Sequence, residues 1–253
     1  MIKRLLLIAV LALAAAQTRA AAQGAPIRLL VSNGVRPALQ ALSGPAEGAI
    51  AHPLAAQFNT TTSLKQKIEA GEEFDVAILT AETIDALIKE GKLAASSRAD
   101  IGSVGIGAGV RAGAKKPDIR TVDAIKRTLA GAKSITFAQD GASRPYIEKM
   151  FDELGIADSV KPKTMLRQGS DASMALVAAG QAEMVITLVS EIMQAQGIEL
   201  VGPLPDKFQN YVRFSAAAST HTKNADAANA LIKFLTNLEV APTFKAKGIQ
   251  PAK

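Results

Sequence analysis

The sequence predicts an α/β protein in which short strands and helices alternate along most of the chain. Short apolar segments such as Ile27–Ser32 and Met184–Thr187 have the length and composition of buried strands. Amphipathic segments of helical length follow them, and Gly, Asn and Pro residues separate the two kinds of segment. Because repeated βα units form parallel sheets covered by helices, we expect mainly parallel sheets flanked by helices.

The first half of the chain begins with a clear strand, which Asn33-Gly34 ends. Pro37 is tolerated in the first turn of the next helix. Further along, a hydroxyl-rich turn opens a short amphipathic helix that a glycine ends, and an apolar strand follows it. The elements expected here are strands at Ile27–Ser32, Phe74–Leu79 and Ser103–Arg111, and helices at Arg36–Leu42, after Thr60, at Glu82–Gly91 and at Thr121–Ala130.

The second half repeats the alternation and ends in two amphipathic helices. Gly155 and Gly197 follow helical segments, as glycine does at helix C-termini. The elements expected here are strands at Ser134–Phe137, Met184–Thr187, Ile198–Val201 and Tyr211–Ala218, and helices at Pro145–Leu154, Asp171–Gly180, Glu191–Gln196, Ala225–Asn237 and Glu239–Lys247.

Two extended segments, Ser103–Arg111 and Tyr211–Ala218, are long enough to cross between two lobes. The chain would leave the first lobe, build the second and return. We therefore expect a signal peptide at 1–22, a first lobe from 23–105 and 216–253, and a second lobe from 106–215, with a cleft between the lobes.

The N-terminus has the features of a cleavable signal peptide. Lys3 and Arg4 precede the apolar run Leu5–Ala16, and small residues then suit cleavage after Ala20 or Ala22. The apolar run is too short to span a bilayer. The chain has no cysteine, which leaves neither a disulfide nor a site for lipid attachment. We expect a periplasmic protein that is not a lipoprotein.

Composition narrows the range of partners. The formal charge of +6 falls to +3 when the signal residues Lys3, Arg4 and Arg19 are removed, which suits small anions better than nucleic acid. Aromatic residues are 4% of the chain and tryptophan is absent, which argues against stacking on bases or sugars. The only histidines, His52 and His221, lie far apart in the sequence. We expect a monomer with no metal, no cofactor and no nucleic-acid partner.

The turn from Thr60 to Ser63 is the most informative local feature. Three threonines and a serine at a helix start bring hydroxyls and free backbone N–H groups together, which is the chemistry of an anion site without formal charge. The alternative is a plain helix N-cap. Within this turn, Thr61 and Thr62 are candidate ligand-binding residues.

Small polar residues recur at other strand-to-helix turns, where ligands of α/β sheets bind. For each turn taken alone, the alternative is that its polar residues cap the helix that follows and bind no ligand. Together they predict a site for a small anion, with candidate binding residues Ser32, Asn33, Gly34, Ser143 and Ser190.

Arginines add positive charge near these turns. Arg144 lies at a helix N-terminus, which is unfavourable to the helix dipole unless an anion binds there; a solvated surface position is the alternative. We count Arg144 among the candidate binding residues. Arg36, in the first turn of a helix, and Arg111, on a crossing segment, are candidates for a carboxylate clamp. Arg213, on the other crossing segment, is a weaker candidate for a residue that faces the cleft.

The chain resembles the molybdate-binding protein family, the periplasmic component of an ABC importer. The matching residues are Thr61-x-x-Leu64, Gln66–Gly71 and Phe74–Val76, with weaker similarity over the whole mature chain. The resemblance implies a two-lobed type II periplasmic-binding fold and a small anionic ligand. It also implies a membrane permease as partner.

The chain departs from this family at the ligand site. The family binds its tetrahedral oxyanion with two serine hydroxyls, backbone N–H groups and a tyrosine. Thr61 matches the second serine, whereas Gly34 takes the place of the first and Leu188 that of the tyrosine. Arg144 replaces a glycine of the backbone-donor turn.

Other segments, such as Gly109–Gly113 and Val201–Pro205, resemble a divergent branch of the family that also includes aconitate isomerase. Several arginines suit a di- or tricarboxylate better than molybdate. The first hypothesis is a protein that captures an oxyanion or carboxylate for an importer. The alternative is an enzyme that interconverts trans- and cis-aconitate by proton transfer, with its general base unassigned and Asp140 and Glu191 near the expected turns.

Overall fold

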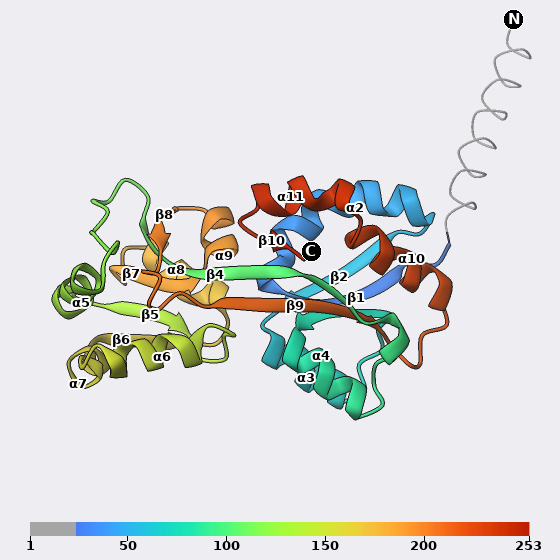
Figure 1. The fold of residues 1–253 in the computed structure, drawn as a ribbon, viewed down its shortest axis with the longest axis horizontal. Helices are drawn as coiled ribbons and strands as arrows, with labels where there is room; N and C mark the ends of the chain where they lie inside the picture. The colour runs from blue at the N-terminus through green and yellow to red at the C-terminus, as the bar shows by residue number, and fades with distance from the viewer. Residues whose placement is uncertain (1–23, 253) are drawn as a thin grey trace, which may run out of the picture.

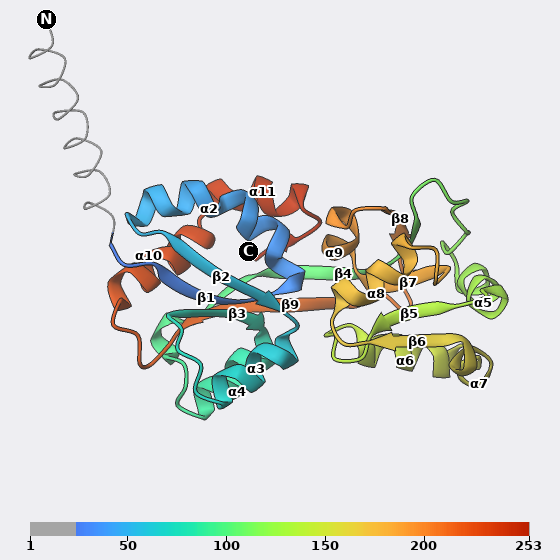
Figure 2. The same ribbon diagram turned by 180° about the vertical axis from the view of Figure 1, so that it is seen from behind.

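The computed structural model describes residues 24–252, so the signal peptide expected at 1–22 lies outside the described residues. Figure 1 shows two lobes joined by two long neighbouring strands, and Figure 2 shows the same arrangement from behind. No helix among the described residues combines the length and the apolar character that a bilayer span requires.

The first lobe is a sheet with helices on both faces. Its strands are β1 (Ile27–Ser32), β2 (Leu54–Asn59), β3 (Val76–Thr80), β9 (Tyr211–Ala218), β10 (Gln250–Pro251) and the first half of β4 (Ala99–Arg111). Its helices are α2 (Arg36–Ile50), α3 (Thr61–Glu69), α4 (Ala81–Lys89), α10 (Ala225–Leu235) and α11 (Ala241–Ala246), with 3-10 turns η1 (Asn33–Val35), η2 (Ala95–Ser97) and η4 (Leu238–Val240).

Alternation along β1 explains the two helix layers. Leu29 and Val31 belong to the cluster that includes residues of α2 and α10, while Leu30 packs with residues of α3 and α4. Successive side chains of a strand point to opposite faces, so both faces of β1 are apolar and both are covered. In Figure 1, α2, α10 and α11 lie above this sheet and α3 and α4 below it.

The second lobe has the same plan. Its strands are the second half of β4, β5 (Ile135–Ala138), β6 (Thr164–Arg167), β7 (Met184–Leu188) and β8 (Ile198–Pro203). Its helices are α5 (Val122–Gly131), α6 (Arg144–Glu153), α7 (Ala157–Val160), α8 (Ser170–Ala178) and α9 (Val189–Gln194), with η3 (Lys161–Lys163). Met184 and Ile186 pack with α5 and α6, whereas Val185 packs with α8 and α9.

The strands run in the order β2-β1-β3-β9-β4-β7-β5-β6, and β8 and β10 pair with β4. The pairs β1–β2, β1–β3, β5–β6 and β5–β7 are parallel. Every pair that involves β4 or β9 is antiparallel. The sheets are therefore mixed rather than mainly parallel throughout. The strand β9 pairs with the first half of β4 over residues 211–216 and with β3 over residues 214–218. Residues 211–215, which were expected in the second lobe, therefore lie in the sheet of the first lobe.

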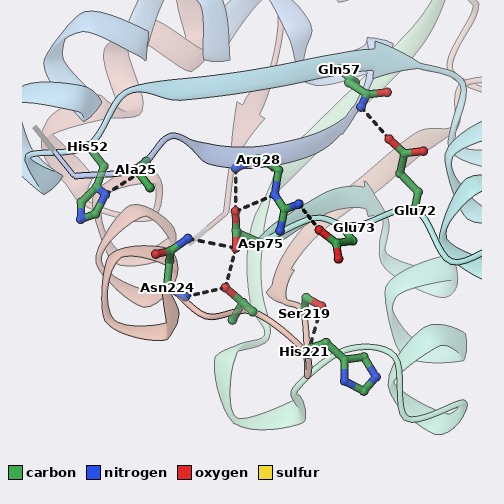
Figure 3. A network of polar contacts seen from close by, with 11 residues as sticks. Ala25, Arg28, His52, Gln57, Glu72, Glu73, Asp75, Ser219, His221 and Asn224 are labelled. Carbon is green, nitrogen blue, oxygen red and sulfur yellow. Dashed lines mark hydrogen bonds and ion pairs between the residues drawn. The ribbon is translucent and has the colours of Figure 1, made fainter.

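A buried carboxylate fixes the outer end of the first lobe, as Figure 3 shows. Asp75 is fully buried and accepts hydrogen bonds from the Arg28 backbone N–H (2.8 Å), Thr222 Oγ1 (2.6 Å) and Asn224 Nδ2 (3.4 Å). The Arg28 guanidinium also lies 3.5 Å away. This network ties β1 and β3 to the segment that leads into α10.

Candidate functional site between the lobes

Strand ends and helix starts from both lobes meet at one small cavity. Its volume is about 10 Å³, close to the least that one water molecule needs. Because β1 and β7 both end here, their carboxyl ends face each other across the interface. The lining residues are Ser32, Thr60, Thr61, Gly141, Ala142, Ser143, Ser170, Thr187, Leu188 and Glu191.

Two buried hydroxyls form the first-lobe wall of the cavity. Thr61 Oγ1 donates to Ser32 Oγ at 3.2 Å and accepts a hydrogen bond from the Thr80 backbone N–H at 3.3 Å. Thr61 is also the first residue of α3, whose first-turn N–H groups have no acceptor in their own helix. This wall offers donors to an anion without carrying a formal charge.

Glu191 forms the opposite wall and is the ionisable residue among those that line the cavity. Its side chain is 5% exposed, and it accepts hydrogen bonds from Thr187 Oγ1 (2.5 Å) and Ser170 Oγ (3.1 Å). Burial raises the pKa of Glu191 to about 7, although the two hydroxyls and Arg36 act to lower it. Burial therefore brings the pKa of Glu191 from the ordinary range of a carboxyl group towards neutral pH.

A chain of hydrogen bonds links Glu191 to the other lobe. Asn33 Nδ2 donates to Ser170 Oγ at 3.1 Å, and that hydroxyl donates to Glu191. Next to this chain, Ser190 Oγ donates to the Gly34 backbone carbonyl at 2.7 Å. Both contacts join η1 of the first lobe to helices of the second, and all these groups are buried.

Asp140 makes a further contact between the lobes. Its carboxylate accepts from Thr60 Oγ1 (2.5 Å) and Ser63 Oγ (3.1 Å) of the first lobe. From its own lobe it accepts from Gln168 Nε2 (2.9 Å) and the Gly169 backbone N–H (2.8 Å). Burial acts to raise the pKa of Asp140, but these hydrogen bonds outweigh it and hold the pKa below its ordinary value.

Some of the expected binding residues line the cavity and others do not. Ser32, Thr61 and Ser143 line the cavity, and Asn33 contacts it through Ser170. Ser190 is buried just behind the cavity, with its hydroxyl committed to Gly34. Thr62 is exposed and faces away.

The arginines do not gather around the cavity. Arg144 is the first residue of α6. Its Nε donates to Glu148 at 2.8 Å and its terminal nitrogen to the Gln139 carbonyl at 2.7 Å. It lines a different hollow, among Phe137, Glu148 and Phe151. The ion pair with Glu148 accounts for the charge at this helix start, so no bound anion is needed to explain it.

The two arginines expected as a clamp are widely separated. Arg111 is exposed at the outer end of β4, next to the start of β7, whereas the cavity lies at the end of β7. Arg36 is not among the residues that line the cavity; it donates to Asn33 Oδ1, pairs with Asp171 at 2.8 Å and lies over the Phe58 ring at 5.3 Å. Arg213 is exposed beside Glu82.

Packing explains the glycine that stands where the resemblance expects a serine. A Cβ on Gly34 would lie 2.6 Å from Phe214 Cζ and 2.7 Å from Leu188 Cδ1. These distances leave no room for a side chain. The two departures noted in the sequence, Gly34 and Leu188, therefore belong together: an apolar contact stands where the family has hydroxyls.

Within residues 24–252, no three His, Cys, Asp or Glu side chains gather closely enough to hold a metal ion. The site's chemistry thus rests on hydroxyls, helix N-termini and Glu191. From the sequence alone, no binding role was expected for Thr187 or Ser170, and Glu191 was one of two candidate bases. The burial of Glu191 becomes visible only in the tertiary structure.

Comparisons with known proteins agree with this architecture. The family model for bacterial extracellular solute-binding proteins matches residues 27–250. The chain belongs to this family. An aconitate isomerase from a Pseudomonas species is 30% identical over 194 residues, which cover 76% of this chain and 73% of that protein.

Solved structures show the same fold at low identity. The periplasmic molybdate-binding protein of Azotobacter vinelandii matches with a TM-score of 0.76 and 16% identity, over 90% of this chain and 100% of that one. The sulfate-binding protein SubI of Mycobacterium tuberculosis H37Rv matches with a TM-score of 0.75 and 17% identity, over 91% of this chain and 88% of that one. The expected two-lobed periplasmic-binding fold is confirmed.

Proposed function

We propose that this protein is an isomerase that binds a small unsaturated carboxylate between its lobes and moves one proton within it, with Glu191 as the general base. Trans-aconitate is the substrate we propose, and the periplasm the compartment. The observation that carries the proposal is the buried Glu191 carboxyl, whose pKa is raised to about 7, in a cavity otherwise lined by anion-binding groups.

A carboxyl group at this position suits catalysis better than anion capture. A fully ionised Glu would repel an anionic ligand, so a site selected only for binding gains nothing from it. A general base works best when its pKa lies near the working pH. Desolvation gives Glu191 that property, and the hydroxyls of Thr187 and Ser170 hold its two oxygens in place.

The proposed reaction balances with a single base. Glu191 takes a proton from the methylene carbon of trans-aconitate, and the C–H electrons form a new double bond to the central carbon. The electrons of the old double bond move to the former vinyl carbon, which takes the proton back from the Glu191 carboxylic acid. No oxidant, reductant or co-reactant is consumed.

The first-lobe wall has the matching role. Negative charge spreads onto the substrate carboxylates as the proton leaves, and fixed donors stabilise such charge. The Ser32 and Thr61 hydroxyls and the first turn of α3 face the cavity opposite Glu191. The 30% identical aconitate isomerase supports this choice of substrate.

Substrate entry requires the lobes to separate. The cavity volume of about 10 Å³ does not accommodate a tricarboxylate, and the strands β4 and β9 that connect the lobes are the natural hinge. We propose that opening admits the substrate and that closure brings Glu191 and the hydroxyl wall to opposite sides of it.

The test is conversion of trans- to cis-aconitate, followed by NMR with purified protein. We expect turnover by the native protein and a loss of about 100-fold or more in Glu191→Gln, because general base catalysis contributes at least that much. Glu153→Gln, a change of the same kind on the exposed side of α6, is the control and should retain turnover. Absence of conversion by native protein, or full activity in Glu191→Gln, would contradict the proposal.

The second candidate is capture of a small anion for delivery to a membrane permease. The paired hydroxyls of Ser32 at the end of β1 and Thr61 at the start of α3 favour it, as does membership of a solute-binding family. Calorimetric titration with molybdate, tungstate, sulfate and tricarboxylates distinguishes the two. Tight binding of any of these without conversion of aconitate would support capture in place of catalysis.

A further inference from the structure

On the basis of the role proposed for Glu191, we propose that Asn33 is a positioning residue that couples closure of the lobes to Glu191 through the hydroxyl of Ser170. Asn33 belongs to η1 of the first lobe, whereas Ser170 starts α8 and Glu191 lies in the first turn of α9, both in the second lobe. The connection therefore exists only when the lobes are together.

The three groups form a short and fully enclosed chain. Asn33 Nδ2 lies 3.1 Å from Ser170 Oγ, which lies 3.1 Å from Glu191 Oε1. Asn33 and Ser170 are each 3% exposed and Glu191 is 5% exposed. A hydrogen bond in such surroundings is stronger than one in water.

The direction of each hydrogen bond is determined by its neighbours. A serine hydroxyl has one hydrogen, so when Asn33 donates to its oxygen that hydrogen is directed to Glu191. The guanidinium of Arg36 donates to Asn33 Oδ1, which turns the amide so that its NH₂ group faces Ser170. Arg36 thus fixes Asn33, and Asn33 fixes Ser170.

Closure changes the surroundings of Glu191 in two ways. It excludes water, and it orients the Ser170 hydrogen towards Oε1. The charged groups that act on Glu191 are Asp171 on α8 and Arg36 on α2, which pair with each other across the lobes at 2.8 Å. Opening separates that pair as well, so the base has its working environment only around an enclosed substrate.

Asn33→Asp is the sharpest test, because it preserves the size of the side chain and its contact with Arg36 while replacing the donor with an acceptor. The new carboxylate would draw the Ser170 hydrogen away from Glu191 and add a negative charge nearby. Both effects favour the protonated form, so we expect the pKa of Glu191 to rise by about one unit or more. The measurement is a carboxyl ¹³C NMR titration, with the Glu191 signal identified by its loss in Glu191→Gln.

Two further variants complete the experiment. Ser190→Ala removes a different hydrogen bond between the same lobes, to Gly34, and should shift the pKa of Glu191 much less than Asn33→Asp, because it leaves the contact of Ser170 with Glu191 intact. Asn33→Ala removes the donor without adding charge and should give a smaller rise, which keeps the test available if Asn33→Asp does not fold. An unchanged Glu191 pKa in either folded Asn33 variant, or an equal shift in Ser190→Ala, would overturn the coupling.

The titration needs no turnover, so it separates this inference from the proposed function. If native protein fails to isomerise aconitate while the Asn33 variants shift the Glu191 pKa, the coupling stands and the reaction does not. If native protein isomerises aconitate and the pKa does not move, the reaction stands and the coupling is overturned.

Discussion

Two buried carboxyl groups in this protein have pKa values displaced in opposite directions. Asp75 accepts hydrogen bonds from a backbone N–H, a hydroxyl and an amide and lies beside a guanidinium, so its pKa is lowered despite burial. Glu191 has two hydroxyl donors and no cation in contact, so burial prevails and its pKa is raised to about 7. The number and charge of donors decide whether a buried acid serves stability or proton transfer.

Asp75→Asn should therefore destabilise the fold. The change leaves an amide facing donors that served a carboxylate, and we expect a loss of roughly 3 kcal/mol in the free energy of unfolding at pH 7. Because the folded pKa lies below the unfolded one of about 3.9, the contribution is present above that pH and disappears as pH falls through the folded pKa. Urea unfolding at a series of pH values measures it.

The matched control is Glu73→Gln, which removes the exposed partner of the same Arg28. Exposed ion pairs contribute little to stability, so this variant should unfold almost like the native protein. A destabilisation of Asp75→Asn that stayed constant down to strongly acidic pH would contradict the role assigned to the carboxylate.

At the level of elements, the start of α3 is held by the protein's own carboxylate. Thr60 caps α3 by accepting from the Ser63 backbone N–H, and both hydroxyls donate to Asp140 of the other lobe. The hydroxyl-rich turn thus has two roles: Thr60 and Ser63 join the lobes, and Thr61 faces the cavity.

Asp140→Asn should weaken this contact and shift the protein towards an open form. The amide accepts hydrogen bonds less strongly than a carboxylate, and its NH₂ group would face donors. The folded pKa of Asp140 is lowered, so its contribution to closure is present above its unfolded pKa and is lost as pH falls through the folded value. Small-angle scattering at pH 7 should give a larger radius of gyration for the variant.

Asp118→Asn is the control for that experiment, since Asp118 pairs with Arg120 inside the second lobe and its pKa is lowered to about 2 without any contact between lobes. The radius of gyration of Asp118→Asn should match that of native protein. Identical scattering from Asp140→Asn and native protein would refute the idea that Asp140 holds the lobes together.

Most elements could be predicted from the sequence because their apolar periodicity is strong. Three strands were missed. Leu54–Asn59 and Thr164–Arg167 are the two ends of the strand order, and the third is the two-residue strand Gln250–Pro251. Their residues are mostly only partly buried, so little apolar pattern marks them. The helix α2 runs to Ile50, eight residues beyond the expected end, despite Pro45 in its interior.

The site was less predictable than the fold. Ser32 and Thr61 could be found because polar residues at strand ends are a local signal. The burial of Glu191 depends on contacts with residues far away in sequence, such as Asn33, and no local pattern records them. For Arg144 a local signal did exist: Glu148 lies four residues on, the spacing of an ion pair along one helix face.

At the scale of the whole molecule, both lobes contribute groups to the one proposed reaction. Each lobe places the carboxyl ends of its parallel strands at the interface, and the antiparallel strands β4 and β9 connect them. Hydrogen bonds that Asn33 and Ser190 donate, and one that Asp140 accepts from Thr60, hold the closed form. In that form the cavity has room for little water, so in the proposed reaction we expect a proton taken by Glu191 to be kept from solvent until it is returned.

The central claim is tested most directly by running the reaction in D₂O with trans-aconitate and reading the new methylene group of the product by NMR. We predict that cis-aconitate forms and that its new methylene carries largely the proton taken from the substrate, because Glu191 is shielded while the lobes are closed. Product whose new methylene carries one deuterium from the solvent in nearly every molecule, or bound trans-aconitate that is never converted, would contradict this prediction.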